Sequence, residues 1–282
     1  MTYIFYNPLS CNGTGEALAK ALAEKLAAQN PELLNITETD PAAFVRPLTA
    51  DDTVIICGGD GTLNNLANSL ADEDAAAQLY LFPCGTGNDF YNDLPESERT
   101  PEGLVPLNKY LRDLPVVEVN GMTRRFINGI GFGIDGMACE VADKQRAAGK
   151  TDINYASISI GLLIHGYRRA TATVTVDGKT QVFNKVWLAA SMKGRKYGGG
   201  MIMAPGQDRL SDQLTLVVAH DLSKLRTLMI FPTIFKGGHV KNTNKVACLK
   251  GREITVKFDH PCALQIDGET VLGVTEYTAR LG

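Results

Sequence analysis

Two glycine-centred segments of the chain carry the residue types that bind phosphate. The first is GGDGTLN, from Gly58 to Asn64, and the second is PCGTGNDF, from Pro83 to Phe90. Each follows a short apolar run and leads into a stretch typical of a helix. A strand that ends in glycines before a helix brings backbone N–H groups and the positive end of the helix dipole together, where phosphate can bind. One such loop is also the usual form of a tight turn, but two loops that share Asp, Thr and Asn indicate a phosphate site.

Neither segment is a Walker A loop, because the chain contains no GxxxxGK[ST] pattern. The phosphate charge would be neutralised by backbone N–H groups, by the helix that begins near Leu63, and by a metal ion. Asp60 is expected to face Mg²⁺, directly or through water, because this ion prefers carboxylate oxygen. The alternative for Asp60 is a turn residue that bonds its own loop. Thr62 is expected to cap the helix and to contact phosphate.

The elements that must position these loops alternate between strand and helix over residues 1–115. Apolar runs at 3–6, 33–37, 53–57 and 79–82 are predicted as strands, and residues 16–29 place leucines at helical spacing. Strands that alternate with helices favour a parallel sheet, whose ligand sites lie beyond the carboxyl ends of the strands. Both glycine segments follow such ends. We therefore predict a Rossmann-like α/β domain that binds nucleotide over residues 1–115.

From residue 116 the pattern changes to strands joined by hairpin turns. Asn120-Gly121 and Asp177-Gly178 are the pairs that type I′ turns favour. Helical stretches are expected near residues 137–146, 153–165 and 223–235. This predicts a β-rich second domain over residues 116–274. The final strand, within 275–282, is expected to return to the first domain.

Charge is distributed unevenly along the chain. Residues 1–120 hold 6 Lys and Arg against 18 Asp and Glu, whereas the remainder holds 22 against 13. Residues 224–257 carry eight Lys and Arg and one acid, Glu253. Such a block is either a solvated face or a surface for an anionic partner. Nucleic acid is not expected as that partner, because the basic residues are not interleaved with aromatics in a recognisable module.

The cysteines and the hydropathy bear on the compartment. The six cysteines are scattered without metal-ligand spacing, which favours reduced thiols in a cytoplasmic protein. No apolar run approaches 18 residues, so no transmembrane helix is expected. The first residues are predicted to form a strand rather than a signal peptide. The oligomeric state stays open, a homodimer included.

Taken together, the two glycine segments resemble the catalytic domain of the diacylglycerol kinase family, which includes sphingosine and ceramide kinases and bacterial lipid kinases. Further segments agree with the family in the same order, so that the matches run from residue 7 to residue 269. NAD kinases and phosphofructokinases share a GGDG loop, but a downstream PxGTxNDF is not their pattern. The further segments are Asn7-Pro8-Leu9-Ser10, Thr37-Glu38, Asn128-Gly129 with Gly131 and Gly133, Tyr197 to Met201 followed by Ala204-Pro205, and Gln265 to Glu269.

This resemblance implies a nucleotide cleft between an N-terminal α/β domain, similar to that of NAD kinase and phosphofructokinase, and a C-terminal β-sandwich domain that takes the lipid. It implies ATP and Mg²⁺ as cofactors. The positions that it assigns to nucleotide binding are Asn7, Pro8, Ser10, Thr37, Gly58, Gly59, Asp60, Gly61, Thr62, Asn64, Gly85, Thr86 and Asn88.

The resemblance also identifies Asp267 as the catalytic base. Phosphoryl transfer to an alcohol needs a carboxylate that accepts the hydroxyl proton and orients the oxygen for in-line attack. The local sequence alone favours a hairpin turn between two strands at Asp267-Gly268, and it is the resemblance that favours the catalytic base.

Three positions depart from the family pattern. Cys11 follows Ser10, at the position where the family has glycine. Met192 replaces the first asparagine of the usual NGxxxGGG. The loop that binds a structural Mg²⁺ in some bacterial members runs here from Asp208 to Gln213 without its glycine. Asp212 is the candidate ligand in that loop, and retention of the metal is left open.

The sequence thus predicts an ATP- and Mg²⁺-dependent lipid kinase that phosphorylates a hydroxyl of a diacylglycerol-like or related lipid. Its basic C-terminal half would bind an anionic membrane peripherally from the cytoplasmic side. Two alternatives stay open: a soluble kinase similar to NAD kinase, and a nucleotide- or lipid-binding regulatory protein without catalysis. The identity of the acceptor lipid is not predicted.

Overall fold

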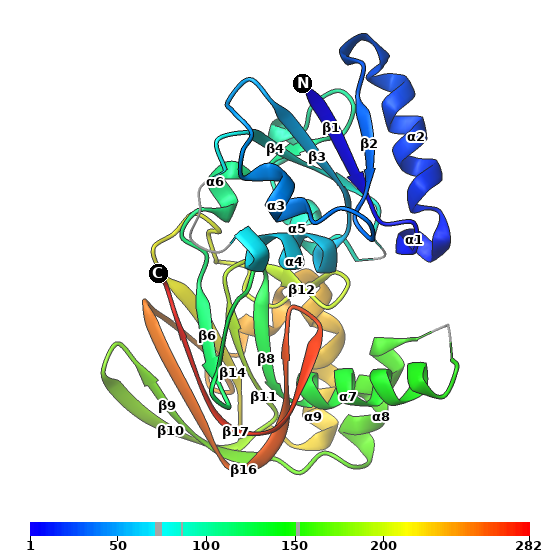
Figure 1. The fold of residues 1–282 in the computed structure, drawn as a ribbon. Coiled ribbons are helices and arrows are strands. Elements are labelled where there is room, and N and C mark those ends of the chain that lie inside the picture. Colours follow the sequence, from blue (N-terminus) through cyan, green and yellow to red (C-terminus); the bar gives the residue numbers. More distant parts are fainter. Residues whose placement is uncertain (71–74, 86, 151–152) are drawn as a thin grey trace. The chain divides into compact units, whose positions relative to one another are not determined.

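The chain forms two compact units, Met1–Leu114 and Pro115–Gly282 (Figure 1). A computed structural model describes residues 1–70, 75–85, 87–150 and 153–282. Within these residues no helix has the length and apolar composition needed to span a membrane. The units are described below one at a time.

The first unit contains a sheet with the strand order β2-β1-β3-β4-β5. The first four strands are parallel, and β5 is antiparallel to β4. Residues Val54 to Gly58 of β3 are buried along their whole length, which is typical of a strand covered on both faces. The strands are β1 (Thr2–Tyr6), β2 (Glu32–Asn35), β3 (Thr53–Gly58), β4 (Gln78–Pro83) and β5 (Val105–Pro106).

Helices cover both faces of this sheet (Figure 1). Ile4 and Ile55 pack with Leu22 of α2 in one cluster of buried residues. Phe5, on the opposite face of β1, meets Phe44 of α3 edge-on at 5.3 Å. The helices are α1 (Ser10–Gly13), α2 (Gly15–Lys25), α3 (Pro41–Val45), α4 (Asp60–Leu70), α5 (Asp89–Asp93) and α6 (Asn108–Leu111), with 3₁₀ turns η1 (Ala27–Gln29) and η2 (Glu96–Glu98).

The second unit is built on a sheet of antiparallel strands in the order β15-β14-β11-β8-β16-β17-β6-β7, with β9 paired to β16 and to β10. A short ladder joins β12 to β13. The strands are β6 (Val116–Val119), β7 (Met122–Arg125), β8 (Gly129–Gly133), β9 (Ala170–Val176), β10 (Lys179–Val186), β11 (Leu188–Met192), β12 (Lys196–Tyr197), β13 (Met201–Ile202), β14 (Leu214–Ala219), β15 (Val246–Gly251), β16 (Glu253–Ile266) and β17 (Glu269–Arg280).

The long strand β16 connects two parts of this sheet. Its first half, Ile254 to Phe258, pairs with β9, and its second half, Leu264 to Ile266, pairs with β8. The register shifts between the two halves. A bulge of this kind bends a strand and increases its twist, which lets one strand belong to two ladders.

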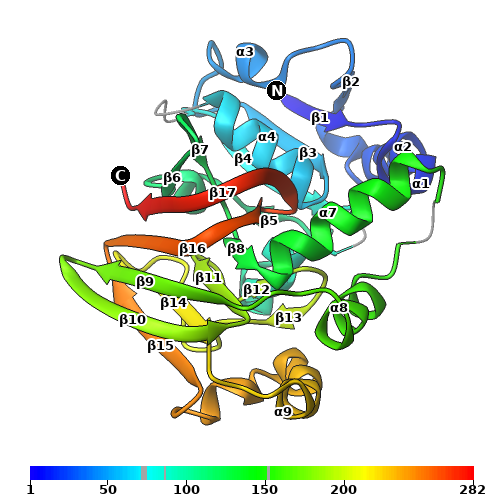
Figure 2. The same ribbon diagram turned by 90° about the horizontal axis from the view of Figure 1, so that it is seen from below.

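Helices of the second unit lie beside the sheet (Figure 2). Helix α7 packs against β16 so closely that a Cβ at Gly136 would lie 2.0 Å from the carbonyl oxygen of Ala263. The 3₁₀ turns η3 and η4 follow α9 directly. The bounds are α7 (Ile134–Ala147), α8 (Tyr155–Ile164), α9 (Lys224–Ile230), η3 (Phe231–Lys236) and η4 (Gly238–Lys241).

The predicted α/β first unit and β-rich second unit are confirmed, but the expected return of the last strand to the first unit is wrong. Residues 269–280 form one continuous strand, β17, whose partners are β16 and β6. The pairing of Tyr277 to Arg280 with β6 satisfies the backbone groups of this strand within the second sheet. The change between units lies between Leu114 and Pro115.

Candidate active site

The two glycine loops are packed against each other, glycine on glycine. The first loop joins β3 to α4, and the second joins β4 to α5. A Cβ added at Gly59 would lie 2.8 Å from the Cα of Gly85, and one added at Gly85 would lie 2.7 Å from the Cα of Gly59. Carbon atoms in contact are ordinarily about 3.5–4.0 Å apart. Both positions therefore require glycine, and the loops form one packed unit.

The carboxylate of Asp60 joins the two loops by hydrogen bonds. Its two oxygens accept from the backbone N–H of Asp89 at 2.9 Å and of Phe90 at 2.8 Å. These donors lie in the first turn of α5, where a negative charge is favourable because N–H groups there have no partner within the helix. Asp60 therefore caps the N-terminus of α5 from a distant segment of the same chain. Its role toward Mg²⁺ stays a prediction.

Asn88 fixes the shape of the second loop. Its backbone has a φ of 48°, in the left-handed region that Asn tolerates better than most residues. Its side chain bonds both backbone groups of Gly85, with Oδ1 accepting from N–H at 2.8 Å and Nδ2 donating to the carbonyl at 2.7 Å. Asn88 thus holds the loop that is predicted to hold nucleotide. Thr86, also predicted to bind nucleotide, lies outside the described residues.

Helix α4 begins at Asp60, three residues earlier than the sequence suggested. A Cβ at Gly58 would lie 2.6 Å from the Cβ of Thr62, so this glycine allows the helix to start directly at the strand end. Asn64 is buried, and its side-chain oxygen accepts a hydrogen bond from Asn68. Asn64 is thus hydrogen-bonded within α4. A Cβ added at Gly61 would have no atom within 4 Å.

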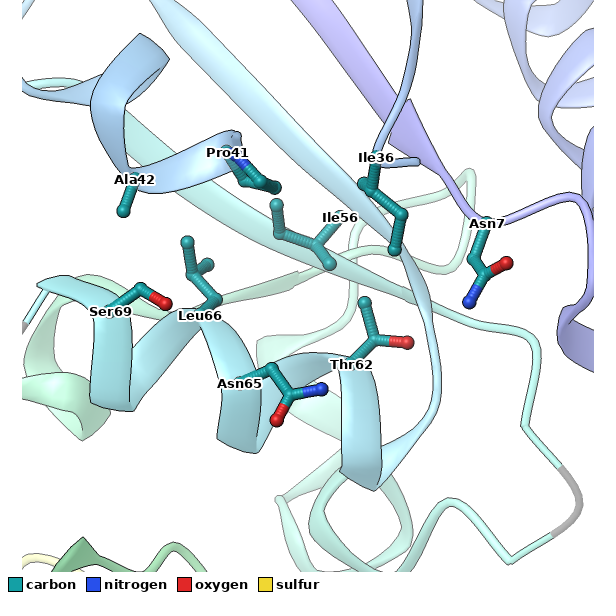
Figure 3. A pocket seen from close by; sticks show the side chains of 9 residues that line it. All are labelled: Asn7, Ile36, Pro41, Ala42, Ile56, Thr62, Asn65, Leu66 and Ser69. Carbon is teal, nitrogen blue, oxygen red and sulfur yellow. The ribbon is translucent and has the colours of Figure 1, made fainter. Parts of the chain in front are cut away.

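A pocket of about 200 Å³ opens beside the first turns of α4 (Figure 3). Asn7 and Thr62 point their polar groups toward it, and Ile36 and Pro41 supply apolar wall. An apolar wall with a few polar groups is the usual composition of a small-molecule site. The pocket is lined by Asn7, Ile36, Pro41, Ala42, Ile56, Thr62, Asn65, Leu66 and Ser69.

The segment after β1 forms a tight turn at the same sheet edge. The carbonyl oxygen of Asn7 accepts from the backbone N–H of Ser10 at 3.0 Å and from its hydroxyl at 2.8 Å. The side chain of Asn7 accepts from the N–H of Leu9 at 2.9 Å. Thr37, after β2, bonds the side chain of Asn35. Pro8 lies inside the turn between Asn7 and Ser10.

Behind the loops lies a group of thiols. The Sγ atoms of Cys57 and Cys84 are 3.3 Å apart, which is hydrogen-bond contact rather than a disulfide. The hydrogen bond with Cys57, followed by burial, raises the pKa of the Cys84 thiol far above its usual value. Burial raises the pKa of the Cys11 thiol to about 11. The thiols of Cys11 and Cys84 are therefore protonated at neutral pH.

In the second unit, Asp267 occupies the turn between β16 and β17. Asp267 and Gly268 have φ values of 47° and 94°, as a type I′ turn requires at both central positions. The carboxylate accepts three backbone hydrogen bonds, from Ile127 at 2.6 Å and from Asn128 and Gly129 at 2.9 Å. The hairpin turn predicted at Asp267-Gly268 is thus confirmed, and the same turn holds the carboxylate in place. Its role as a base stays a prediction.

Two further side chains support the backbone around Asp267, and the sequence assigned a role to neither of them. Arg209 is buried and donates to the carbonyl oxygen of Ile127 and, at 2.9 Å, to the side-chain oxygen of Asn128. Gln265 is buried and accepts from the N–H of Gly268 at 2.7 Å. The available signal for Gln265 was its place in the QIDGE motif. Arg209 lies in the loop from Asp208 to Gln213, where the sequence suggested only Asp212 as a functional residue.

Asp135 is another carboxyl of the second unit that the sequence did not single out. It lies in the first turn of α7, and the hydroxyl of Tyr197 donates to it. Burial raises the pKa of Asp135 to about 6, against the lowering effect of that hydrogen bond. A Cβ at Gly131 would lie 2.8 Å from both this carboxyl and the side-chain nitrogen of Gln265, so the glycines of β8 make room for these groups.

The structure gives Asp212 a surface position. It is exposed and forms an ion pair with Arg252 at 3.1 Å. Lys193, which directly follows Met192, is buried, and its amino group donates to the carbonyl oxygen of Ser211 at 3.1 Å. Among the described residues, no three His, Cys, Asp or Glu side chains lie close enough together to hold a metal ion. Metal binding at Asp60 and Asp212 stays a prediction.

Comparison with known proteins accounts for both units. The diacylglycerol kinase catalytic domain matches residues 1–117, and the YegS C-terminal NAD kinase beta sandwich-like domain matches residues 128–280. The chain belongs to the diacylglycerol kinase catalytic family. It is therefore a lipid kinase. A diacylglycerol kinase of Mycobacterium tuberculosis is 26% identical to it over 262 residues, which are 89% of this chain and 83% of the relative.

Solved structures show that the fold of the kinase is shared. A diacylglycerol kinase from Bacillus anthracis superposes with a TM-score of 0.63 at 18% identity, over 100% of this chain and 94% of that one. An NAD kinase from Archaeoglobus fulgidus, crystallised in complex with ATP, reaches a TM-score of 0.50 at 12% identity, over 100% and 90%. The predicted likeness to the NAD kinase fold is thereby confirmed.

Proposed function

We propose that the protein transfers the γ-phosphate of ATP to a hydroxyl of a diacylglycerol-like membrane lipid, with Mg²⁺ as cofactor. The observation that carries this proposal is Asp267, a carboxylate held by three backbone N–H groups in a turn with little freedom to move. Such fixation suits a group that must orient a hydroxyl before transfer. The packed glycine loops of the first unit suit the nucleotide that supplies the phosphate.

The loops and the neighbouring pocket fit a nucleotide. The loops have no lysine, so the N–H groups at the start of α4 would bind phosphate, and the pocket beside Asn7 and Thr62 would take the nucleoside. Mg²⁺ would neutralise phosphate charge, with Asp60 contacting it through water. Asp60 would then serve two purposes, because its carboxylate already holds the second loop.

The base step falls to Asp267. Its carboxylate would accept the proton of the lipid hydroxyl as the oxygen bonds to phosphorus, late in a loose transition state. Arg209 and Gln265 hold the backbone around it. The transfer requires the phosphate bound by the first unit to reach the hydroxyl beside Asp267.

The acceptor defines where the enzyme works. ATP is supplied in the cytoplasm, and the hydroxyl of a diacylglycerol lies at the bilayer surface. We therefore propose a cytoplasmic enzyme that binds the membrane peripherally through its basic second unit. The supporting observation is the run of eight Lys and Arg against one acid in residues 224–257.

The proposal is tested by incubating the purified chain with labelled ATP, Mg²⁺ and total lipid extract, followed by mass spectrometry for a new phosphate on one lipid class. Asp267→Asn should abolish the product while ATP affinity stays within about twofold of the wild type, because Asn cannot accept a proton. Asp177→Asn is a matched control. Asp177 also occupies an Asp-Gly turn with positive φ, and its carboxylate accepts backbone N–H groups of Arg252 and Glu253 at 2.9 Å.

Three results would each lead to a different conclusion. Phosphate transfer to NAD and to no lipid would favour the soluble kinase similar to NAD kinase. ATP binding without transfer to any acceptor would favour a regulatory protein. Equal activity of Asp267→Asn and Asp177→Asn would show that Asp267 is only a turn residue.

A further inference from the structure

Helix α8 exposes an uncharged apolar stripe. Its exposed positions are Ser157, Ile160, Gly161 and Ile164, which recur at the spacing of one helix face. Leu163 is buried, and no residue of Tyr155–Ile164 carries a charge. The solvent-facing side of a helix is ordinarily polar, so this stripe departs from the pattern of a water-facing helix.

Helix α9 and the turn after it continue this feature. Leu225 is 70% exposed and Met229 is 62% exposed, one helical turn apart. Phe235 in η3 is exposed and meets Phe231 edge-on. Leu228 and Phe231 pack instead against the core of the second unit. Other side chains of these elements thus pack against the core, whereas Leu225, Met229 and Phe235 face solvent.

The two helices pack against each other (Figure 2). The amino group of Lys224, at the start of α9, donates to the carbonyl oxygen of Ile164 at 2.9 Å, at the end of α8. Of the eleven exposed large apolar side chains found in the described residues, five lie on these helices and η3. We name these five the apolar rim: Ile160, Ile164, Leu225, Met229 and Phe235.

The charged residues of α9 and η3, which carry three of the five rim side chains, are all basic. Lys224, Arg226 and Lys236 are exposed beside it. No Asp or Glu occurs between Leu222 and Arg252. Apolar side chains flanked by Lys and Arg on helices are the composition of segments that lie in the interface of an anionic bilayer. A second copy of the chain is a poorer occupant, because a symmetric contact would bring like charges together.

We propose that the apolar rim inserts into the interface of an anionic lipid bilayer, with Arg226 and Lys236 contacting the headgroups. The biological role of this insertion rests on the proposed function, because the proposed acceptor is a membrane lipid. Vesicle binding itself needs neither ATP nor catalysis. The five side chains would enter the acyl boundary, and the cations would stay at headgroup level because their long side chains reach water.

The test is vesicle flotation without nucleotide, comparing phosphatidylcholine alone with phosphatidylcholine containing phosphatidylglycerol. The double variant Leu225→Gln/Met229→Gln should lower the partition coefficient on anionic vesicles about a hundredfold, because burying each of the two side chains contributes about tenfold. The matched control is Val182→Gln/Leu272→Gln, two residues of the same unit that are 60% and 59% exposed outside the rim. This control should bind as the wild type does.

A charge variant separates the two contributions. Arg226→Glu/Lys236→Glu should weaken binding to anionic vesicles and reduce its dependence on salt. Circular dichroism and the thermal midpoint of each variant establish that it is folded. Flotation of Leu225→Gln/Met229→Gln equal to that of the wild type would overturn the proposal. So would a wild-type dimer in analytical ultracentrifugation that this variant converts to monomer, because the rim would then be an interface between copies.

Activity on two forms of acceptor separates this inference from the proposed function. The variant Leu225→Gln/Met229→Gln should keep wild-type turnover on a short-chain diacylglycerol below its critical micelle concentration. The same variant should lose turnover on an acceptor lipid that is embedded in vesicles. If the wild type phosphorylates neither form, the proposed function fails while flotation still decides the rim. Equal loss of activity on both forms would overturn the assignment of the rim to docking.

Discussion

The contact between Gly59 and Gly85 makes Gly59→Ala a sharp test of the loop architecture. The added Cβ would lie 2.8 Å from the Cα of Gly85, whereas carbon atoms in contact are ordinarily about 3.5–4.0 Å apart. The loops must therefore separate by about 0.7 Å or more. The neighbour is backbone without a side chain that could rotate away, so the backbone itself must move.

The size of the effect follows from what the loops share. A separation of about 0.7 Å would stretch the bond of Asp60 to the N–H of Asp89, now 2.9 Å, beyond hydrogen-bond range. Overpacking a well-packed site costs about 1–3 kcal/mol. We expect the free energy of unfolding to fall by that amount. A displacement approaching 1 Å at a binding site reduces function by about tenfold to a hundredfold, and we expect that loss in ATP affinity.

Gly61→Ala is the matched control for stability. Gly61 lies two residues further along, inside α4, with nothing within 4 Å of its would-be Cβ. Alanine in a helix is more favourable than glycine by about 1 kcal/mol, so this variant should be as stable as the wild type or more stable. Urea unfolding and calorimetric titration with ATP measure both quantities. If Gly59→Ala unfolds at the urea concentration of Gly61→Ala and binds ATP like the wild type, the loops are not limited by this contact.

Two further predictions concern the second unit. Arg209→Met removes charge-assisted hydrogen bonds to Ile127 and Asn128, so the free energy of unfolding should fall by about 2–3 kcal/mol. The kcat of phosphate transfer should also fall, while ATP affinity is kept. An unchanged kcat would contradict the positioning role of Arg209. The carboxyl of Asp135 has a pKa of about 6 in the folded chain, above its usual value, so the folded state binds more protons between about pH 4 and pH 6 and stability falls as pH rises through that window. The fall in the free energy of unfolding that Asp135 causes is on the order of 3 kcal/mol at most. In urea unfolding measured at a series of pH values, Asp135→Asn should not show this fall. A pH profile like that of the wild type would show that this carboxyl is not its cause.

Local patterns allowed much of the fold to be predicted. The strand ends that carry the glycine loops could be predicted because buried parallel strands are continuous apolar runs and glycines follow them. The hairpin at Asp177-Gly178 could be predicted because its turn type demands these residues. Both signals lie within a few residues of the feature that they predict.

What the sequence did not predict depends on contacts between distant segments. The sequence did not predict that β17 pairs with β16 and β6. The pattern of residues 269–280 indicates a strand, but it does not indicate which strands lie beside it. Asp60 was expected to face a metal, yet its carboxylate bonds N–H groups 29 and 30 residues away in α5. Arg209 bonds residues 81 and 82 positions away. No local spacing encodes such pairs, and only the folded chain brings them together.

The pairing of β17 also has a consequence for how this protein is made. Strand β6, which opens the second unit, pairs with residues Tyr277 to Arg280 at the far end of the chain. During translation β6 leaves the ribosome long before its partner exists, so the sheet stays unfinished until β17 has been synthesised. The turn that bears Asp267 forms only when β16 and β17 pair. In the order of synthesis, both glycine loops are therefore complete well before the turn that bears Asp267 can form.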